Sequence, residues 1–464
     1  MNAIDTSSPG PVALVEPPVP LGRWVAMREL GRDALATLEK IWRSHGDVVM
    51  LHVGPRSAKL GLMAFSSPEA AAQIFGGSTW RSFDKNDSAY RELRRWIGEG
   101  LLSAQGEEWT RQKRFVQPVF TKGAVDGYTD LMVAEIADVL ETLPTSASGD
   151  EADIDLGDTM MALTLRVVVR ALFGESGDDA VPVVRRSFPP MADTIIQRGL
   201  SPIKEPMTWP TPRNRRGLRA RADLWEVCEQ LITERRASGD YERGDLLGRL
   251  IAARDNGEAL SDTEIRDQVL VFMLAGHETT STALTFALHL LGRHTDIQDA
   301  VRAEVAEVIG DRTPTAADAA NLTLTNAVLK EAMRLYPSAP MIGRVATEDT
   351  TVAGAPVRRG MAVVVSVRNI QRHPDLWPDP LRFDPSRFLG GAEKERHRYA
   401  WMPFGGGPRA CIGQYFSMTE AVLVLAMLLR EHSVTALADT DHLPVTATIT
   451  QAPVEPVRVR LHRL

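Results

Sequence analysis

The sequence has only two cysteines, no long apolar run and no excess of positive charge. Cys228 and Cys411 lie far apart in a chain of 464 residues, which excludes a disulfide scaffold and fits a reducing cytoplasm. Neither a signal peptide nor a stretch of about 20 apolar residues is visible, so we expect no membrane span. The net charge is −7, from 60 acidic and 53 basic residues, which argues against nucleic-acid binding.

The sequence does contain a proline-rich start and a long series of helical patterns. Prolines and small polar residues fill positions 1–20, which predicts a flexible leader. Apolar spacing predicts helices over residues 28–43, 128–143, 159–173, 218–236, 261–293, 326–336 and 414–430. Short apolar runs predict strands over residues 48–53, 59–65 and 361–367. Residues 78–105 are polar and aromatic without a clear period, and we interpret them as a loop.

A glycine-rich stretch, residues 404–413, directly precedes the last predicted helix. Its glycines exclude a helix or strand interior, and it is no phosphate-binding loop because the Gly-Lys-Ser/Thr ending is missing. Cys411 therefore lies where a helix begins, and the free N–H groups there predict a lowered thiol pKa. Such a thiolate is a nucleophile or a metal ligand. The alternative is a buried structural thiol, which is our interpretation of Cys228, whereas the glycines let a flat molecule approach Cys411.

A polar cluster, residues 276–282, interrupts the apolar middle of the longest predicted helix. Ser261 and Glu264 form a capping box at the start of that helix. Polar groups in a core are costly unless they are satisfied. The cluster is no zinc-protease motif, because H-E-x-x-H requires a histidine where Ser281 stands. It is either a kink whose hydroxyls bond back to the preceding turn or a functional site.

Two charged motifs follow in the C-terminal half. Glu331 and Arg334 are three residues apart and share a helix face. Arg387 belongs to a Pro-x-Arg-Phe sequence at positions 385–388. Alone, an acid–arginine pair of this kind is most often a surface salt bridge.

Together these motifs resemble the cytochrome P-450 haem-thiolate monooxygenases. The cysteine-loop pattern of that family, F-x-x-G-x-R-x-C-x-G, is matched here by Phe404, Gly407, Arg409, Cys411 and Gly413. The polar cluster resembles the family's oxygen-binding groove, and the two charged motifs resemble its buried charge network. The resemblance covers nearly the whole chain after the leader. It implies a mainly α fold with a small β region, one domain over residues 21–464, and a haem between two long helices.

By this resemblance the cofactor is haem b, iron protoporphyrin IX. Cys411 would be the axial thiolate on the iron, and Phe404 would pack beside its sulfur. Arg409 and Arg344 would pair with haem propionates, as a guanidinium fork can.

Trp109 and Lys113, one helical turn apart, match a pair that also donates to a propionate in the family. Arginine is usual at the second position. Lysine there offers a point charge rather than a fork, so a solvated basic helix face is the alternative interpretation of Lys113.

The resemblance implies a monooxygenase that inserts one oxygen atom of O₂ into an apolar small molecule of terpenoid, fatty-acid or polyketide type. Glu278 and Thr279 would be the catalytic acid–alcohol pair that manages protons. The sequence shows no flavin or iron–sulfur motif, so electrons would come from a ferredoxin or flavodoxin. We expect a cytoplasmic monomer. The alternatives are a haem-thiolate peroxygenase or isomerase, which usually lacks the acid–alcohol pair, and a non-catalytic haem-binding sensor.

Overall fold

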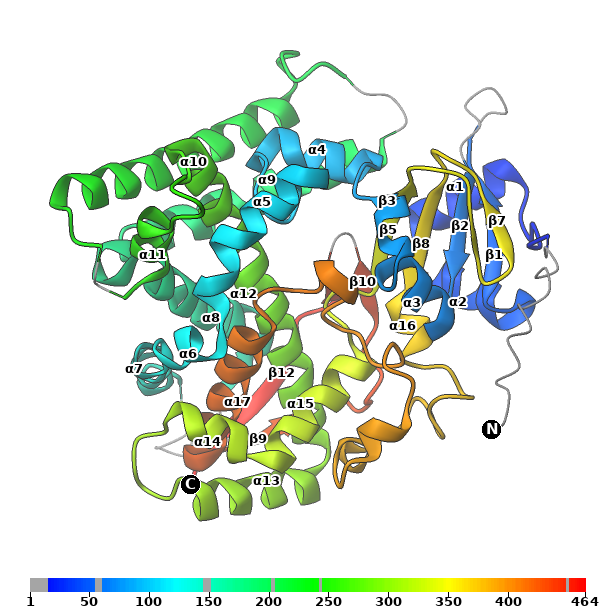
Figure 1. The fold of residues 1–464 in the computed structure, drawn as a ribbon. Coiled ribbons are helices and arrows are strands. Elements are labelled where there is room, and N and C mark those ends of the chain that lie inside the picture. Colours follow the sequence, from blue (N-terminus) through cyan, green and yellow to red (C-terminus); the bar gives the residue numbers. More distant parts are fainter. Residues whose placement is uncertain (1–15, 55–60, 145–151, 202–204, 242–243, 448–449) are drawn as a thin grey trace, which may run out of the picture.

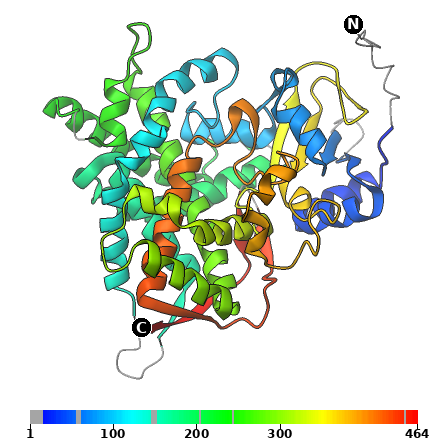
Figure 2. The same ribbon diagram turned by 60° about the horizontal axis from the view of Figure 1, so that its bottom comes forward.

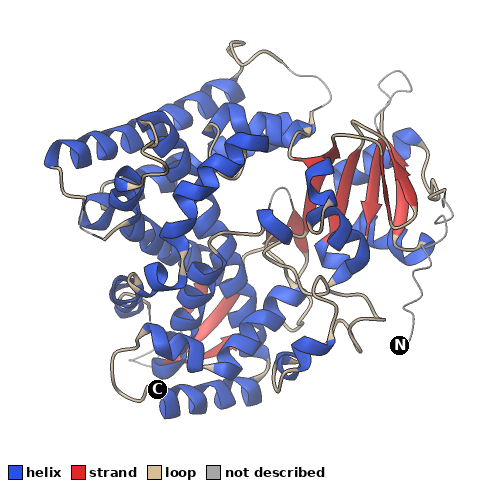
Figure 3. Cartoon of the chain, in the orientation of Figure 1, coloured by secondary structure: helices blue, strands red, loops and turns tan. Residues whose placement is uncertain are grey.

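The computed structural model describes residues 16–54, 61–144, 152–201, 205–241, 244–447 and 450–464. Most of the expected leader and the first two residues of the second predicted strand lie outside these described residues. Helices form the larger part of the molecule, and a five-stranded sheet lies at one side of them in both views (Figures 1 and 2). Figure 3 shows how much of the chain is helical. The expected mainly α fold with a small β region is confirmed.

The helices follow one another along most of the chain. Those of the first half are α1 (Arg23–Arg32), α2 (Ala34–His45), α3 (Pro68–Phe75), α4 (Ser88–Ile97), α5 (Gly106–Val116), α6 (Lys122–Asp126), α7 (Thr129–Glu141), α8 (Leu156–Phe173), α9 (Ala180–Leu200) and α10 (Pro212–Ser238). Those of the second half are α11 (Leu246–Ala252), α12 (Asp262–Arg293), α13 (Thr295–Val308), α14 (Ala316–Asn321), α15 (Thr323–Leu335), α16 (Val367–Ile370) and α17 (Gln414–Glu431). The predicted helices match α7, α8, α10, α12, α15 and α17 closely, whereas the first predicted helix is divided between α1 and α2.

The five-stranded sheet joins distant parts of the chain in the order β1-β2-β8-β5-β3. Its strands are β1 (Val48–His52), β2 (Gly61–Phe65), β3 (Phe83–Asp84), β5 (Met341–Ala346) and β8 (Ala362–Ser366). Strands β2 and β8 are parallel and the other pairs are antiparallel. Asp84 pairs with Val345 across β3 and β5, so the residues next to this pair, Lys85 and Arg344, are brought to one place.

Three smaller sheets complete the β structure of the described residues. They consist of β4 (Ala152–Asp155), β12 (Arg458–Arg463) and β9 (His432–Ala436), of β6 (Thr350–Val352) with β7 (Ala355–Val357), and of β10 (Val445–Ala447) with β11 (Gln451–Pro453). The β10–β11 hairpin matters for the site, because its second strand begins beside α12.

Helix α12 runs through the core of the helical part (Figure 1). Ser261 accepts from the N–H of Glu264, and the Glu264 carboxylate accepts from the N–H of Ser261, so the predicted capping box is present. The helix is apolar and buried over most of its length, as expected for a helix without a solvent face. Solvent can therefore reach the central turn of α12 only where neighbouring side chains leave a gap.

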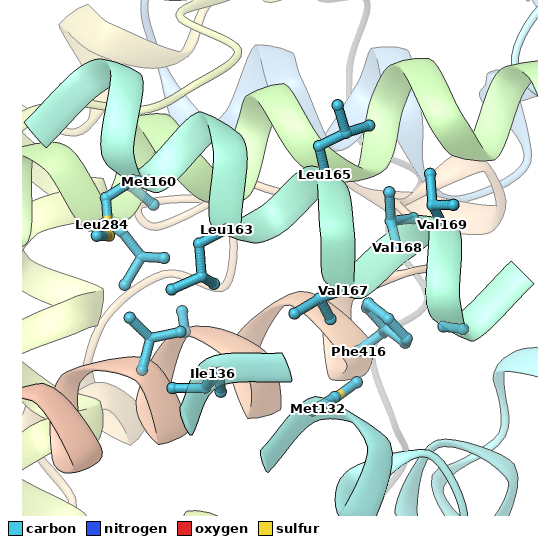
Figure 4. Packing of buried hydrophobic residues seen from close by; sticks show 14 of the residues in the cluster. Met132, Ile136, Met160, Leu163, Leu165, Val167, Val168, Val169, Leu284 and Phe416 are labelled. Atoms are coloured by element: carbon cyan, nitrogen blue, oxygen red, sulfur yellow. The ribbon is translucent and has the colours of Figure 1, made fainter. Parts of the chain in front are cut away.

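The main core lies where α7, α8, α12 and α17 meet. Figure 4 shows labelled core side chains from each of these helices: Met132, Ile136, Met160, Leu163, Leu165, Val167, Val168, Val169, Leu284 and Phe416. Fully burying an aliphatic side chain of this size stabilises the fold by about 1.5–3 kcal/mol. This packing fixes α12 against α17, the helix that follows the cysteine.

The interpretation of residues 78–105 as a loop is wrong, because the segment contains β3 and the helix α4. Asp87 caps α4 by accepting from the N–H of Tyr90 at 2.9 Å. Leu93, Trp96 and Ile97 form the buried face. The helix packs mainly on α9, and Trp96 also lies beside Gly217 of α10. The apolar residues of α4 recur at helical spacing, so the sequence carried a helical signal that the loop interpretation overlooked.

Candidate active site

The glycine-rich loop before α17 folds back on itself and presses against α3. The N–H of Cys411 donates to the carbonyl of Phe404 at 2.8 Å. Gly407 has a φ of 67°, and a Cβ added there would lie 1.6 Å from the carbonyl oxygen of Phe75, so only glycine fits. The Phe404 ring is half-buried and meets the ring of Trp401 edge-on, with centroids 6.2 Å apart. The loop therefore holds Cys411 in a defined place.

Cys411 is accessible, whereas Cys228 is fully buried in α10 as predicted. Cys411 lies two residues before Gly413, the N-cap of α17. Protein atoms nevertheless surround much of its sulfur, and this burial raises the pKa of Cys411. The N–H of Gly413 and the positive charge of Lys85 lower the pKa only in part. The predicted lowering of the thiol pKa is therefore wrong, because loss of solvation outweighs the helix N-terminus.

Two cations share the ring of Trp109, which is buried in α5. The guanidinium carbon of Arg409 lies 4.5 Å from the ring centroid, and the ammonium nitrogen of Lys113 lies 5.2 Å from it. Lys113 donates to the carbonyl of Pro408 at 2.8 Å, and Arg409 donates to the carbonyl of Ala104 at 2.9 Å. Burial lowers the pKa of Lys113 and lowers that of Arg409 to about 10. Lys113 thus contacts the cysteine loop instead of lying on a solvated helix face.

Two further buried cations come from the small β region. Arg344, on β5, is 5% exposed, and its guanidinium lies 4.9 Å from the ring centroid of Phe75. Lys85, next to β3, is 7% exposed and donates to the carbonyl of Leu102 at 3.1 Å. Burial, and then the positive charges of Arg344 and Arg409, hold the pKa of Lys85 well below its usual value. Both groups lose hydration and repel one another, so they favour a negatively charged neighbour.

These four side chains form what we term the cation cluster: Lys85, Lys113, Arg344 and Arg409. Among the described residues, Asp84 supplies an ion pair to the cluster, 3.7 Å from Arg409, and the charges of Asp84 and Asp87 also act on Arg344. The positive charge exceeds the negative charge that these carboxylates supply.

Sequence analysis missed Lys85, a lysine without a motif in a segment interpreted as a loop. No local signal marks it. The β3–β5 pairing, Asp84 opposite Val345, is what carries Lys85 to the cluster.

The polar cluster on α12 satisfies itself along the helix. Thr279 donates to the carbonyl of Ala275 at 2.8 Å, and Thr280 donates to that of Gly276 at 3.0 Å, as the back-bonding interpretation predicts. The hydroxyl of Thr280 also meets that of Ser417 in α17 at 2.9 Å. Ala275 is exposed and Thr279 is half-buried, although the helix on either side is mostly buried. The central turn of α12 therefore borders accessible space and is tied to the first turn after the cysteine loop.

Glu278 and Thr279 bond to different partners. The carboxylate oxygen Oε1 of Glu278 accepts from the hydroxyl of Thr450 at 2.5 Å, whereas the Thr279 hydroxyl points to its own helix. Burial raises the pKa of Glu278, and the bond from Thr450 lowers it only in part. Because no sequence motif marks Thr450, only the structure shows that it contacts the acid.

Glu331 and Arg334 form a fully buried pair on α15, in which Arg334 Nε and Nη2 bind the two carboxylate oxygens at 2.6 and 2.8 Å. Arg387 Nε lies 3.4 Å from the same carboxylate, as the family resemblance implied. Arg334 also donates to the carbonyl of Gln371 at 2.8 Å, and the side chain of Gln371 accepts from the N–H of Met402 at 2.8 Å. The pair is therefore connected to the segment that leads into the cysteine loop.

Comparison with known proteins decides the family. The sequence model described as Cytochrome P-450 matches residues 16–459. The chain is a cytochrome P-450. Its relatives include the cyclooctat-9-en-7-ol 5-monooxygenase of Streptomyces melanosporofaciens, 36% identical over 91% of this chain and 88% of that protein, and the pentalenene oxygenase of Streptomyces avermitilis, 34% identical over 90% of each chain. The solved haem domain of cytochrome P450DA superposes with a TM-score of 0.85 and 29% identity over 97% of this chain and 98% of that one.

This cytochrome P-450 is accordingly a haem-dependent monooxygenase that uses O₂, a redox partner and a small apolar substrate. Among the described residues, no helix has both the length and the apolarity that crossing a bilayer requires. The described site fits the family's cofactor in three ways. Cys411, in the loop before α17, and Ala275, in α12, both have accessible surface, and the Thr280–Ser417 contact joins the two helices. The cation cluster matches the anionic edge of a porphyrin.

Proposed function

We propose that this cytochrome P-450 binds haem b through Cys411 and oxygenates a cyclic terpenoid. One observation carries the proposal. The accessible thiol of Cys411 lies on the same loop as Arg409 of the cation cluster, and the positive charge of that cluster exceeds the negative charge of its carboxylate partners. Porphyrin propionates are the anions that match this arrangement. Lys85, Arg344 and Arg409 would bind them, with Trp109 and Lys113 supporting Arg409. Phe404 would pack beside the sulfur.

When bound, the haem iron supplies the activation of O₂ from which one oxygen atom reaches a C–H bond of the substrate. Cys411 would donate its thiolate to iron, because a coordinated thiol loses its proton even where burial alone raises the pKa. The Thr279 hydroxyl borders accessible space and would hold a water molecule there. Glu278 keeps its proton to higher pH than an exposed glutamate because it is buried, so it would serve as the proton donor to that water.

The substrate class comes from the relatives. Two of them are named for cyclooctat-9-en-7-ol and pentalenene, and the chain aligns with most of the length of each. Small Ala275 leaves room over the central turn of α12. We therefore propose a polycyclic terpene or terpene alcohol as substrate, a ferredoxin or flavodoxin as electron donor, and a cytoplasmic monomer with one domain over residues 21–464.

The test of the haem site compares the two cysteines. Reduced wild-type protein with CO should show the red-shifted Soret band of a thiolate-ligated haem. Cys411→Ser should lose this band and Cys228→Ser, the matched control, should keep it. The reverse result would overturn the assignment.

The test of the substrate class uses the same chromophore. Cyclic terpenes and terpene alcohols, with fatty acids as a comparison set, would be screened for a low-to-high-spin Soret shift. Compounds that shift the spectrum would then be incubated with NAD(P)H, a ferredoxin reductase and ferredoxin. Oxygenated terpene product is the expected outcome, and turnover of fatty acids alone would refute the terpenoid proposal.

A further inference from the structure

The segment that enters β11 bonds directly to Glu278 and is connected to Thr279 through Ser338. Thr450 donates to Glu278 at 2.5 Å. The next residue, Gln451, donates its backbone N–H to the carbonyl of Ser338 at 2.8 Å. The Ser338 hydroxyl in turn donates to the carbonyl of Thr279 at 2.8 Å. The side chain of one partner and the backbone of the other are thus held by one C-terminal segment.

A second contact fixes this segment on α12. The hydroxyl of Thr282 lies 3.4 Å from the carbonyl of Gln451 and 2.9 Å from that of Glu278. Gln451 is fully buried. The hydroxyl of Thr450 is therefore held in place by the backbone on its C-terminal side.

We propose that Thr450 is a positioning residue for Glu278. The Thr450 hydroxyl holds the Glu278 carboxyl towards β11, and so controls when Glu278 can pass a proton towards Thr279. The inference rests on the proposed function, in which Glu278 is the proton donor. It adds a residue outside α12 to the machinery of proton delivery. Glu278 must give up its bond to Thr450, or turn about it, before it can serve Thr279, because the two side chains bond in different directions in the structure.

Among the described neighbours of Glu278, Thr450 is the polar group that affects the pKa of its carboxyl. Apart from burial, the bond from Thr450 is the cause that acts on the pKa of Glu278. His277 is adjacent on the helix, but its Nδ1 is bonded to the carbonyl of Met273 and its ring meets that of Phe188 edge-on at 5.1 Å. Burial lowers the pKa of His277 to about 4, so it stays neutral.

The neighbouring elements present hydroxyls to this turn of α12 rather than charges. Thr164 of α8 donates to the carbonyl of His277 at 3.0 Å, Ser338 follows α15, and Ser417 belongs to α17. A hydrogen bond donated to a carboxylate favours its ionised form. Removing the Thr450 hydroxyl should therefore raise the pKa of Glu278 further.

Infrared difference spectroscopy across pH tests this without turnover. The carboxyl band that disappears in Glu278→Gln would be followed in the purified holoprotein. In Thr450→Val, which keeps the side-chain shape, its titration should move to higher pH. Thr450→Ser, which keeps the hydroxyl, should restore it. Thr446→Val makes the same change at an exposed position of the same hairpin and should leave the band unmoved.

The coupling of electrons to product gives the second readout. Thr450→Val should change the product formed per NAD(P)H, and should cause no further change in a Glu278→Gln background, since paired residues are not additive. An unmoved band in Thr450→Val, an equal shift in Thr446→Val, or equal effects in both backgrounds would overturn the inference. A wild-type protein without oxygenase activity would instead refute the proposed function, and the infrared titration would still decide the role of Thr450.

Discussion

Replacing Glu331 by alanine is expected to destabilise the fold and its retention of haem. The side chains of Glu331 and Arg334 are both 0% exposed, so the change leaves a guanidinium charge in the core with only carbonyl partners. It also removes the acceptor of the Asp384 N–H, at 2.9 Å, and the charge facing Arg387. Breaking a buried pair costs about 3–5 kcal/mol. That is a large part of the roughly 5–15 kcal/mol by which a folded domain is stable.

Denaturant unfolding followed by circular dichroism, together with haem content from absorbance, measures the effect. Asp299→Ala is the matched control, because Asp299 and Arg302 are also three residues apart on a helix and lie 2.7 Å from each other, but Asp299 is 69% exposed. That pair should contribute at most about 1 kcal/mol. If both variants unfold at the same denaturant concentration and retain the same haem content, the pair does not act as a buried charge network and the reasoning is refuted.

Three further outcomes are expected. Thr279→Ala should bind haem and substrate normally but divert NAD(P)H to hydrogen peroxide, because a positioned proton donor contributes about 10²–10⁴-fold; unchanged peroxide per product would exclude this role. Arg409→Ala should lose haem to apomyoglobin faster than Lys113→Ala, since a guanidinium binds a carboxylate by two bonds, and the opposite order would reverse the ranking. Because burial raises the pKa of Glu278, the donor is present below that raised pKa and lost as pH rises through it; coupling should fall accordingly, and Glu278→Gln should abolish this dependence.

Features that depend on neighbours along the chain were predictable from the sequence. The capping box of Ser261 and Glu264 sets the start of α12, and spacing alone places Glu331 and Arg334 on one face of α15. The glycines of residues 404–413 excluded a helix or strand interior there, and the structure has a loop with one short 3₁₀ turn. In each case the cause of the structure lies within a few residues or in a motif.

What depends on distant contacts could not be predicted in the same way. The helix α9 went unrecognised because Pro189 and Pro190 lie inside it, and prolines normally end a helix; packing on α4 and α10 overrides that preference. Lys85 reaches its cluster only through strand pairing. The Cys411 pKa was predicted from the helix start alone, and the surrounding protein reverses its direction.

The hydrogen bonds that anchor the cysteine loop also set an order of assembly during synthesis. Lys113 and Pro408 are 295 residues apart, and Arg409 and Ala104 are 305 residues apart. Ala104 and Lys113 leave the ribosome long before the cysteine loop does, so they lack these bonding partners during most of translation. Contacts of such sequence separation form late in folding. The site is therefore assembled only after residues 404–413 are made, and a product truncated before them would carry Lys85, Lys113 and Arg344 but neither Arg409 nor Cys411.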